Sequence, residues 1–266
     1  MGLTRKPEST MKKKKLSHYL NVIYELSRLD FKLKYYGSVL GLLWSFLKPF
    51  MMLAILYVVF FYFLKVGIQN YEVYLLLGII FWNFFADTTK DSTVGVVTKA
   101  HLLQKTNLPP FVVVTSVIVH SLWTFLITLA IFFIFFFALG LHLTWSALTL
   151  LLLVPSLIIL TAGVSFLIVP LHMRFKDFGH IWDIFLQMLF WATPIVYQYT
   201  LVPEPYSRWY LLNPVARIII DARNAVLYNF FPEAKQLLIT IAITAVVFAG
   251  GWLVFRKYGR TFIDEL

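Results

Sequence analysis

The chain has 266 residues, of which 60% are hydrophobic and only 14% are charged. Soluble domains are about half apolar and a quarter charged, so this composition excludes a soluble globular enzyme, a disordered chain and a collagen-like chain. Cysteine is absent, which excludes disulfides, thiolate nucleophiles and Cys-based metal sites. The net charge of +10 would suggest nucleic acid in a soluble protein. In a membrane chain it is interpreted from where the charges lie, so we expect no nucleic-acid partner.

The first 37 residues predict a cytoplasmic N-terminus with a helix too polar to span a bilayer. Four consecutive lysines at 12–15 suit an anchor near anionic lipid headgroups. Apolar residues then recur at three- and four-residue steps, which predicts an amphipathic helix in the membrane interface: Leu16, Leu20, Ile23, Leu26, Leu29 and Leu33. Two roles remain open for this helix. It is either an orientation anchor, or a helix that contacts a cytoplasmic partner or guides a lipid headgroup.

Residues 38–255 predict an all-α membrane domain, since a bilayer core is crossed by about 20 apolar residues in a helix. The expected transmembrane helices are six, over residues 38–64, 73–97, 111–140, 144–171, 181–200 and 235–255. Residues 201–232 are rich in proline and predict short re-entrant external helices. Irregular backbone at membrane depth must be covered by protein or line a cavity, so this region is a candidate for the external end of a translocation path.

The distribution of basic residues predicts the orientation. An even number of spans places both termini on one side, and most of the 23 Lys and Arg residues fall on that side, in the N-terminal segment, two loops and the tail at 256–266. Since cytoplasmic segments carry the excess of Lys and Arg, both termini are expected in the cytoplasm.

Motifs for chemistry are missing from the sequence. It contains no GxxxxGK[ST] phosphate loop, no HExxH and no GxSxG. The third, fourth and sixth expected spans have no Asp, Glu, Lys or Arg, whereas ion-coupled transporters usually place such residues in the membrane. His120 alone is more typical of hydrogen-bonded packing than of a proton relay. We therefore expect no catalytic residue, no metal and no cofactor in this chain.

Two polar cytoplasmic segments interrupt the apolar runs. Residues 98–110 (TKAHLLQKTNLPP) predict either a short amphipathic helix along the membrane surface or an ordinary loop, ended by Pro109 and Pro110. Residues 172–180 (HMRFKDFGH) are short, charged and placed between two long apolar spans. A segment of this kind suits docking into the groove of a partner protein.

Several short runs, each weak alone, occur in a specific order along the chain. They are DFKLKYY at 30–36, SVLGLLWSFLKP at 38–49, GIIFWNFF at 78–85, LLQKTNLP at 102–109, RFKD at 174–177, TPIVY at 193–197, Asn213-Pro214, and FIDEL at 262–266. With these runs the chain resembles the membrane subunit of type-2 ABC exporters, in the polysaccharide-export branch that includes O-antigen and wall teichoic acid translocation permeases.

The resemblance implies a multi-pass permease of the bacterial cell (inner or plasma) membrane. It would pair with a second copy of itself and bind two separate ATPase subunits, which carry ATP and Mg²⁺. The path between the copies would carry an undecaprenyl-diphosphate-linked polysaccharide outward. Residues implied in coupling to the ATPase are Lys99, His101, Gln104, Lys105, Arg174, Phe175, Lys176 and Asp177. Residues implied in the external re-entrant region are Thr193, Pro194, Tyr197, Asn213 and Pro214.

One feature departs from the family pattern. The family commonly has Arg and Asp adjacent in the second coupling segment, whereas this chain reads Arg-Phe-Lys-Asp at 174–177. The positions of the charges against an ATPase groove are therefore less defined than the segment itself.

Aromatic side chains are candidates for lining the path, because their faces can stack on sugar rings. The candidates are Trp44, Phe46, Phe81, Trp82, Phe84 and Phe85. The alternative is that they pack between helices or form interfacial belts.

Two other functions stay open from the sequence. One is a type-2 ABC permease for a small lipophilic compound or drug. The other is an integral-membrane glycosyl- or acyltransferase, for which Asp87, Asp91 and Asp183 are the near-membrane carboxylates available, although they form no recognisable motif.

Overall fold

The structure is a computed structural model that describes residues 8–106, 108–175, 177–204 and 206–259. These residues form helices and no strand, so the predicted all-α fold is confirmed. The elements are, in chain order, α1 (Glu8–Tyr35), η1 (Gly41–Leu43), α2 (Trp44–Tyr57), η2 (Val58–Phe63), α3 (Tyr71–Thr98), α4 (Ala100–Thr106), α5 (Phe111–Ala138), η3 (Trp145–Thr149), α6 (Leu150–Arg174), α7 (Phe178–Trp191), η4 (Tyr199–Leu201), α8 (Tyr206–Tyr210), α9 (Pro214–Val226) and α10 (Ala234–Tyr258).

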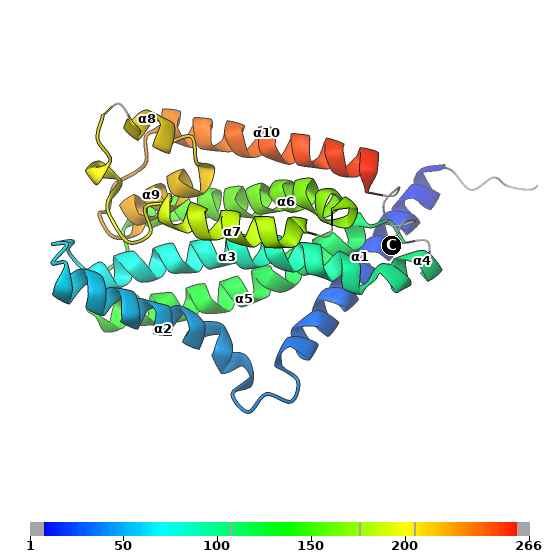
Figure 1. The fold of residues 1–266 in the computed structure, drawn as a ribbon, viewed down its shortest axis with the longest axis horizontal. Coiled ribbons are helices and arrows are strands. Elements are labelled where there is room, and N and C mark those ends of the chain that lie inside the picture. The colour runs from blue at the N-terminus through cyan, green and yellow to red at the C-terminus, as the bar shows by residue number, and fades with distance from the viewer. Residues whose placement is uncertain (1–7, 107, 176, 205, 260–266) are drawn as a thin grey trace, which may run out of the picture.

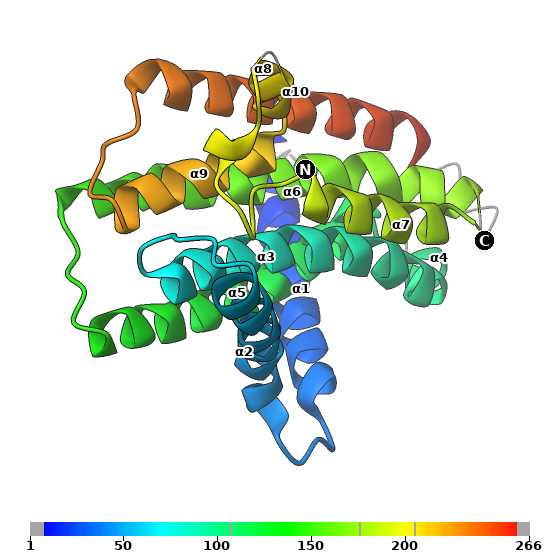
Figure 2. The ribbon, with the colours of Figure 1, turned by 60° about the vertical axis from the view of Figure 1, so that its left-hand side comes forward.

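The helices α3, α5, α6, α7 and α10 run along the long axis of the molecule (Figure 1). Helix α3 is central, because it contacts α2, α5, α6, α7 and α9. Helices α1 and α2 diverge from the bundle and meet at an elbow over residues 36–43 (Figure 2). One end of the bundle carries α4 and the last turn of α10, and is called here the α4 end. The other carries α8 and α9, and is called the α9 end (Figure 1).

Within the residues that the structure describes, four helical segments are long and apolar enough to cross a membrane: Gly41–Phe63, Phe111–Ala138, Trp145–Arg174 and Ala234–Tyr258. Helix α3 is not among them, although it has 28 residues, since Glu72, Asp87, Lys90 and Asp91 lie along it. Helix α7 has only 14 residues. Length and composition therefore support a multi-pass membrane protein, and the number of crossings stays a prediction.

The helix expected over residues 181–200 is shorter in the structure. Helix α7 ends at Trp191, and turns and bends occupy residues 192–197. Proline lacks a backbone N–H and its ring collides with the preceding turn of a helix, so Pro194 stops α7 from continuing. The expected re-entrant range 201–232 contains two short helices, α8 and α9.

Glycines bring α6 and α10 into backbone contact. A Cβ added to Gly163 would lie 2.6 Å from the Cα of Phe248, and one added to Gly251 would overlap the carbonyl oxygen of Gly163. Helix association in lipid relies on close van der Waals packing, which small residues permit. The two glycines therefore allow α10 to pack directly on α6.

Helix α1 packs on α5 through only part of the predicted apolar stripe. Ile23 and Ser27 are buried there. Of the predicted apolar set, four leucines are at least half exposed in the single chain: Leu16, Leu20, Leu29 and Leu33. These side chains are available to lipid or a partner, and the interfacial orientation of α1 stays a prediction.

Candidate functional site

The α9 end holds a buried network around residues 193–197. Helix α9 begins at Pro214 because Asn213 caps it: the Asn213 Oδ1 accepts from the backbone N–H of Val215 at 3.0 Å and of Ala216 at 3.3 Å. The Asn213 amide also donates to the Thr193 hydroxyl, at 3.0 Å. The two predicted motifs of the external region, TPIVY and Asn213-Pro214, are thus joined directly.

Arg223 of α9 is the centre of this network. Its side chain is only 2% exposed, and its guanidinium donates to three backbone carbonyls, those of Tyr74 (2.9 Å), Ile195 (2.7 Å) and Pro194. Its Cζ also lies 3.5 Å from the centre of the Tyr74 ring. No ion pair to Arg223 occurs within the described ranges. Carbonyl dipoles and an aromatic face therefore replace a counter-ion.

Gly78 provides the space for this arginine. A Cβ at position 78 would overlap the Arg223 Nη2 and lie 3.1 Å from its Cζ. Only glycine therefore lets the guanidinium approach α3 this closely. The sequence interpretation missed both residues. The available signal was that Arg223 follows Ile219 and Ala222 at helical spacing, on the face of α9 that is otherwise apolar.

Tyrosines from α3 satisfy the next two carbonyls of the turn segment. The Tyr71 hydroxyl donates to Val196 O and the Tyr74 hydroxyl to Tyr197 O, each at 2.8 Å. The Tyr197 hydroxyl in turn reaches Trp191 O at 2.7 Å. Irregular backbone is tolerated in a membrane when protein groups satisfy its hydrogen bonds. Residues 193–197 are held in that way by α3 and α9.

The predicted external residues therefore have a structural role within one copy. Thr193 and Pro194 are buried, and Tyr197, Asn213 and Pro214 are partly buried. Asn213 bonds directly to Thr193, and Tyr210 links Tyr197 to Asn213: its hydroxyl contacts the Tyr197 hydroxyl at 2.9 Å and its carbonyl accepts from the Asn213 N–H at 3.2 Å. A role in an external path stays a prediction that concerns the surface around this cluster.

At the α4 end, most residues predicted for ATPase coupling lie on two segments, α4 and the junction of α6 and α7. His101 and Lys105 of α4 are exposed, while Leu103 is buried beneath them. This alternation makes α4 a short surface helix, one of the two structures predicted for residues 98–110. Arg174, Phe175 and Asp177 are exposed at the junction of α6 and α7. Gln104 is exposed as well, and Lys176 lies outside the described residues.

Lys99 differs from the rest of the predicted coupling set. It forms an ion pair with Asp30, which ties the end of α3 to α1, and both side chains are at most 20% exposed. Two further pairs link helices nearby: Lys48–Asp87 joins α2 to α3, and Lys90–Asp183 joins α3 to α7, each at 2.9 Å. Lys99 therefore contributes to the internal packing of the α4 end. Asp87 and Asp183, two of the three carboxylates considered for a transferase, are engaged in these pairs.

Most predicted path aromatics pack inside the single chain. Phe81, Trp82, Phe84 and Phe85 are each at most 5% exposed. They contact other rings, such as Phe81 with Phe125 at 5.5 Å and Trp82 with Phe190 at 5.8 Å between ring centres. In one copy, these four aromatic side chains therefore pack between helices. By contrast, Trp44 is exposed and Phe46 is partly exposed. Their role in a path remains a prediction.

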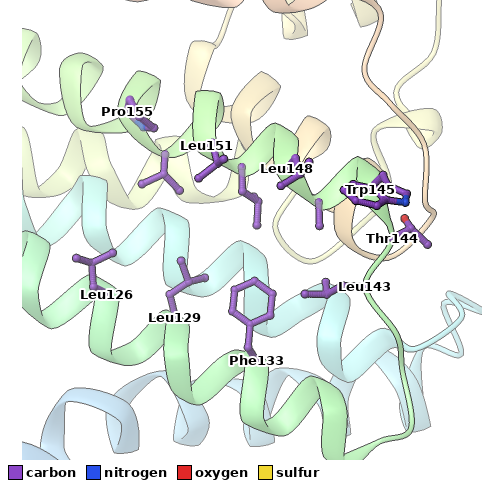
Figure 3. A pocket seen from close by; sticks show the side chains of 12 residues that line it. Leu126, Leu129, Phe133, Leu143, Thr144, Trp145, Leu148, Leu151 and Pro155 are labelled. Carbon is purple, nitrogen blue, oxygen red and sulfur yellow. The ribbon is translucent and has the colours of Figure 1, made fainter.

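A large apolar groove of about 870 Å³ separates α5 from the start of α6 (Figure 3). Leu126, Leu129 and Phe133 point into it from α5, opposite Leu148 and Leu151 (Figure 3). Trp145 lies at its edge with 79% of its surface exposed. The lining has almost no polar group that could recognise a polar ligand. The groove therefore suits the acyl chains of the surrounding lipid. Among the residues that the structure describes, no three His, Asp or Glu side chains gather closely enough to hold a metal ion.

Comparisons with known proteins identify a family and several relatives of this chain. Residues 22–231 match the model of the ABC-2 type transporter family. The chain is 29% identical to an O-antigen export system permease protein, RfbA, of Klebsiella pneumoniae, over 94% of this chain and 97% of that protein. It is 23% identical to an O-antigen export system permease protein RfbA of Myxococcus xanthus, over 95% and 98%. It is 24% identical to the polysialic acid transport protein KpsM of Escherichia coli, over 82% and 85%.

Proposed function

Because the chain belongs to the ABC-2 type transporter family, we propose that it is the membrane subunit of an ATP-driven exporter of a lipid-linked polysaccharide. The observation that carries this proposal is the similarity, over nearly the full length of both chains, to permeases named for O-antigen export. The cargo is a polymer attached to undecaprenyl diphosphate, moved from the cytoplasm to the outside. ATP and Mg²⁺ are bound by a separate partner subunit.

The proposed topology has six crossings, with α3 as the second and α7 with the following turns as the fifth. The α4 end faces the cytoplasm, in agreement with the excess of Lys and Arg in the segments there. Helix α4 and the α6–α7 junction then contact the ATPase through exposed charged and aromatic side chains. The α9 end, with its buried arginine, closes the external side.

A second copy of the chain completes the path. Helices α2 and α7 support this, because both carry large apolar side chains that are at least half exposed in one copy: Met51 and Ile55 on α2, Ile184 and Met188 on α7. Contiguous exposed apolar surface marks contacts with protein or lipid.

Purification from native membranes tests the proposal. The full chain, tagged at its C-terminus and extracted in mild detergent, should retain a partner with a phosphate-binding loop in about equal amount. A chain that purifies alone, or with partners that lack an ATP site, would contradict the exporter assignment.

Paired variants test the docking surface. Changing Arg174→Ala together with Asp177→Ala should reduce recovery of the ATPase, because both side chains project from the α6–α7 junction. Lys65→Ala is the matched control, an exposed charge at the α9 end. Full recovery of the ATPase with the double variant would contradict docking at this junction.

A further inference from the structure

Two neighbouring cavities open at the α9 end and are called here the α9 cleft. The larger has a volume of about 360 Å³ and is lined by α9, the connection from α9 to α10 and the first turn of α10. The smaller, of about 150 Å³, shares Tyr199, Ile220 and Asn224 with it as a common wall. The connection to α10 runs along the outer edge of this end (Figure 2). Sites for small molecules are usually clefts of about 300–1,000 Å³, so the larger cavity alone has a suitable volume.

Asp221 is the polar group of the α9 cleft that lacks a partner. It lines the larger cavity and is only 8% exposed. Within the described residues, the side-chain hydrogen bonds of α9 come from Arg217 and Arg223 alone, and no ion pair includes Asp221. A nearly buried carboxylate without a partner is costly, so such a group usually serves a ligand or water. Its oxygens are not among the polar atoms that are fully enclosed without a partner, so a ligand in the cavity can reach them.

Arg217 fixes the wall beside this carboxylate. It lies one helical turn before Asp221, and its guanidinium donates to the Leu211 carbonyl and, at 2.8 Å, to Gln236 Oε1. Gln236 belongs to α10 and lines the same cavity. The bond therefore joins α9 to α10 at the wall of the cavity. A wall held in this way is ordered before a ligand arrives, which lowers the cost of binding.

Aromatic rings form the open side of the larger cavity. Tyr199, Phe230 and Phe231 line it, and 38%, 72% and 62% of their surfaces are exposed. The backbone N–H of Phe230 donates to the carbonyl of Asn224 at 2.9 Å, which fixes the turn that carries the two phenylalanines. Rings that stand exposed beside polar groups suit a ligand with both an apolar face and a polar edge.

The charges around the α9 cleft favour a neutral ligand. Arg217 lies within electrostatic reach of Asp221 and disfavours a metal cation there. Asp221 and Glu233, which is exposed at the rim, disfavour a phosphate. A carboxylate accepts hydrogen bonds, and the amide of Asn224 can both donate and accept. Sugar hydroxyls match these groups, and the carbon face of a sugar ring matches the aromatic rings.

We propose that the α9 cleft binds a sugar unit of the exported polymer on the external side. Asp221 accepts from the sugar hydroxyls, and Tyr199, Phe230 and Phe231 cover the ring. The site is separate from the buried aromatics of α3 that were considered for the path. The inference rests on the proposed function, which supplies the polysaccharide and places the α9 end outside.

Because the chain contains no cysteine, one introduced thiol reports on the α9 cleft alone. Ile220→Cys places it on the wall that both cavities share and removes no polar group. Native cells with the complete transporter are treated with a membrane-impermeant maleimide, and the labelled fraction is measured on the purified chain. Cells that export the polymer are compared with cells in which the transferase that starts the polymer is deleted.

Export of the polymer should slow labelling of Ile220→Cys at least about threefold, which corresponds to a site that is about two-thirds occupied. Tyr206→Cys is the matched control, because Tyr206 lies on α8, is 66% exposed and lines neither cavity. Its labelling rate should be the same in both kinds of cell. Equal rates for Ile220→Cys in the two kinds of cell would overturn the proposal, and so would a complete lack of labelling.

Asp221→Leu, added to Ile220→Cys, tests the carboxylate. Loss of a hydrogen bond to a charged group weakens binding about tenfold, so the protection by the polymer should disappear. Thermal stability should stay equal or rise, because no hydrogen bond or ion pair of the described residues is lost. Glu204→Leu is the control, since it removes an exposed carboxylate at the same end outside both cavities and should leave the protection unchanged.

Protection that persists in Asp221→Leu would overturn the role of the carboxylate and with it the proposal. The ATPase is measured in the same purified samples. An unprotected α9 cleft in a chain that still carries its ATPase contradicts the sugar site and leaves the proposed function standing. Loss of the ATPase from the unaltered chain contradicts the proposed function itself.

Discussion

The contact between Gly78 and Arg223 makes a quantitative prediction. In Gly78→Ala, the added methyl group overlaps the guanidinium, which must withdraw from the carbonyls of Pro194 and Ile195. Hydrogen bonds to charged groups contribute about 1.5–3 kcal/mol each. The intrinsic preference of helices for alanine returns up to about 1 kcal/mol. Two such bonds amount to about 3–6 kcal/mol, so we expect a net loss of about 2–5 kcal/mol in the free energy of unfolding.

A double-mutant cycle isolates this contact. In an Arg223→Met background the guanidinium is gone and the flexible side chain can shift, so Gly78→Ala should cost less than about 1 kcal/mol. The coupling energy between the two positions should therefore be about 2 kcal/mol. It is measured on the purified chain in detergent micelles by chemical unfolding, with tryptophan fluorescence as the signal.

Gly250→Ala is the control for this cycle. Gly250 is also a helical glycine, but nothing lies within 4 Å of the position of its Cβ. Its change should be neutral or slightly stabilising. If Gly78→Ala costs the same with and without Arg223, or no more than Gly250→Ala, the packing argument for the buried arginine is refuted.

Two further changes test the two ends of the bundle. Asn213→Ala removes the cap of α9 and the hydrogen bond to Thr193, so the free energy of unfolding should fall by about 1–2 kcal/mol. Backbone amides at the start of α9 should then exchange hydrogen faster. Unchanged exchange would contradict the role of Asn213 as the cap. Lys99→Met should lower the free energy of unfolding more than Lys90→Met, because the pair with Asp30 is less exposed than the pair with Asp183. Equal unfolding free energies for the two variants would show that burial does not distinguish the two ion pairs.

The long apolar helices could be predicted closely from the sequence. Helix α5 occupies residues 111–138 and α10 residues 234–258, near the expected ranges, because uninterrupted apolar runs in lipid have no alternative to a helix that satisfies its own backbone. The helix expected over 181–200 was too long, since the proline at 194 ends it by local sterics that hydrophobicity does not report.

The packing of α1 could not be predicted from its pattern. The apolar residues recur at helical steps, yet the structure buries Ile23 and Ser27 and leaves Leu29 and Leu33 exposed. When lipid is as apolar as a leucine side chain, burial against protein and exposure to lipid both satisfy an apolar residue. Periodicity in a membrane chain therefore does not identify the face that packs on a neighbouring helix.

The sequence by itself determined the membrane class, the order of the long helices and the two polar segments at one end. These features follow from local composition and from residues near one another in the chain. The tertiary structure alone revealed the role of Arg223, whose guanidinium reaches the carbonyl of Tyr74, 149 residues away, and the need for Gly78 beneath it. It also paired Lys99 with Asp30 of α1, 69 residues away in the chain. Such contacts depend on which faces of distant helices meet, and helix association decides that only when the whole bundle packs.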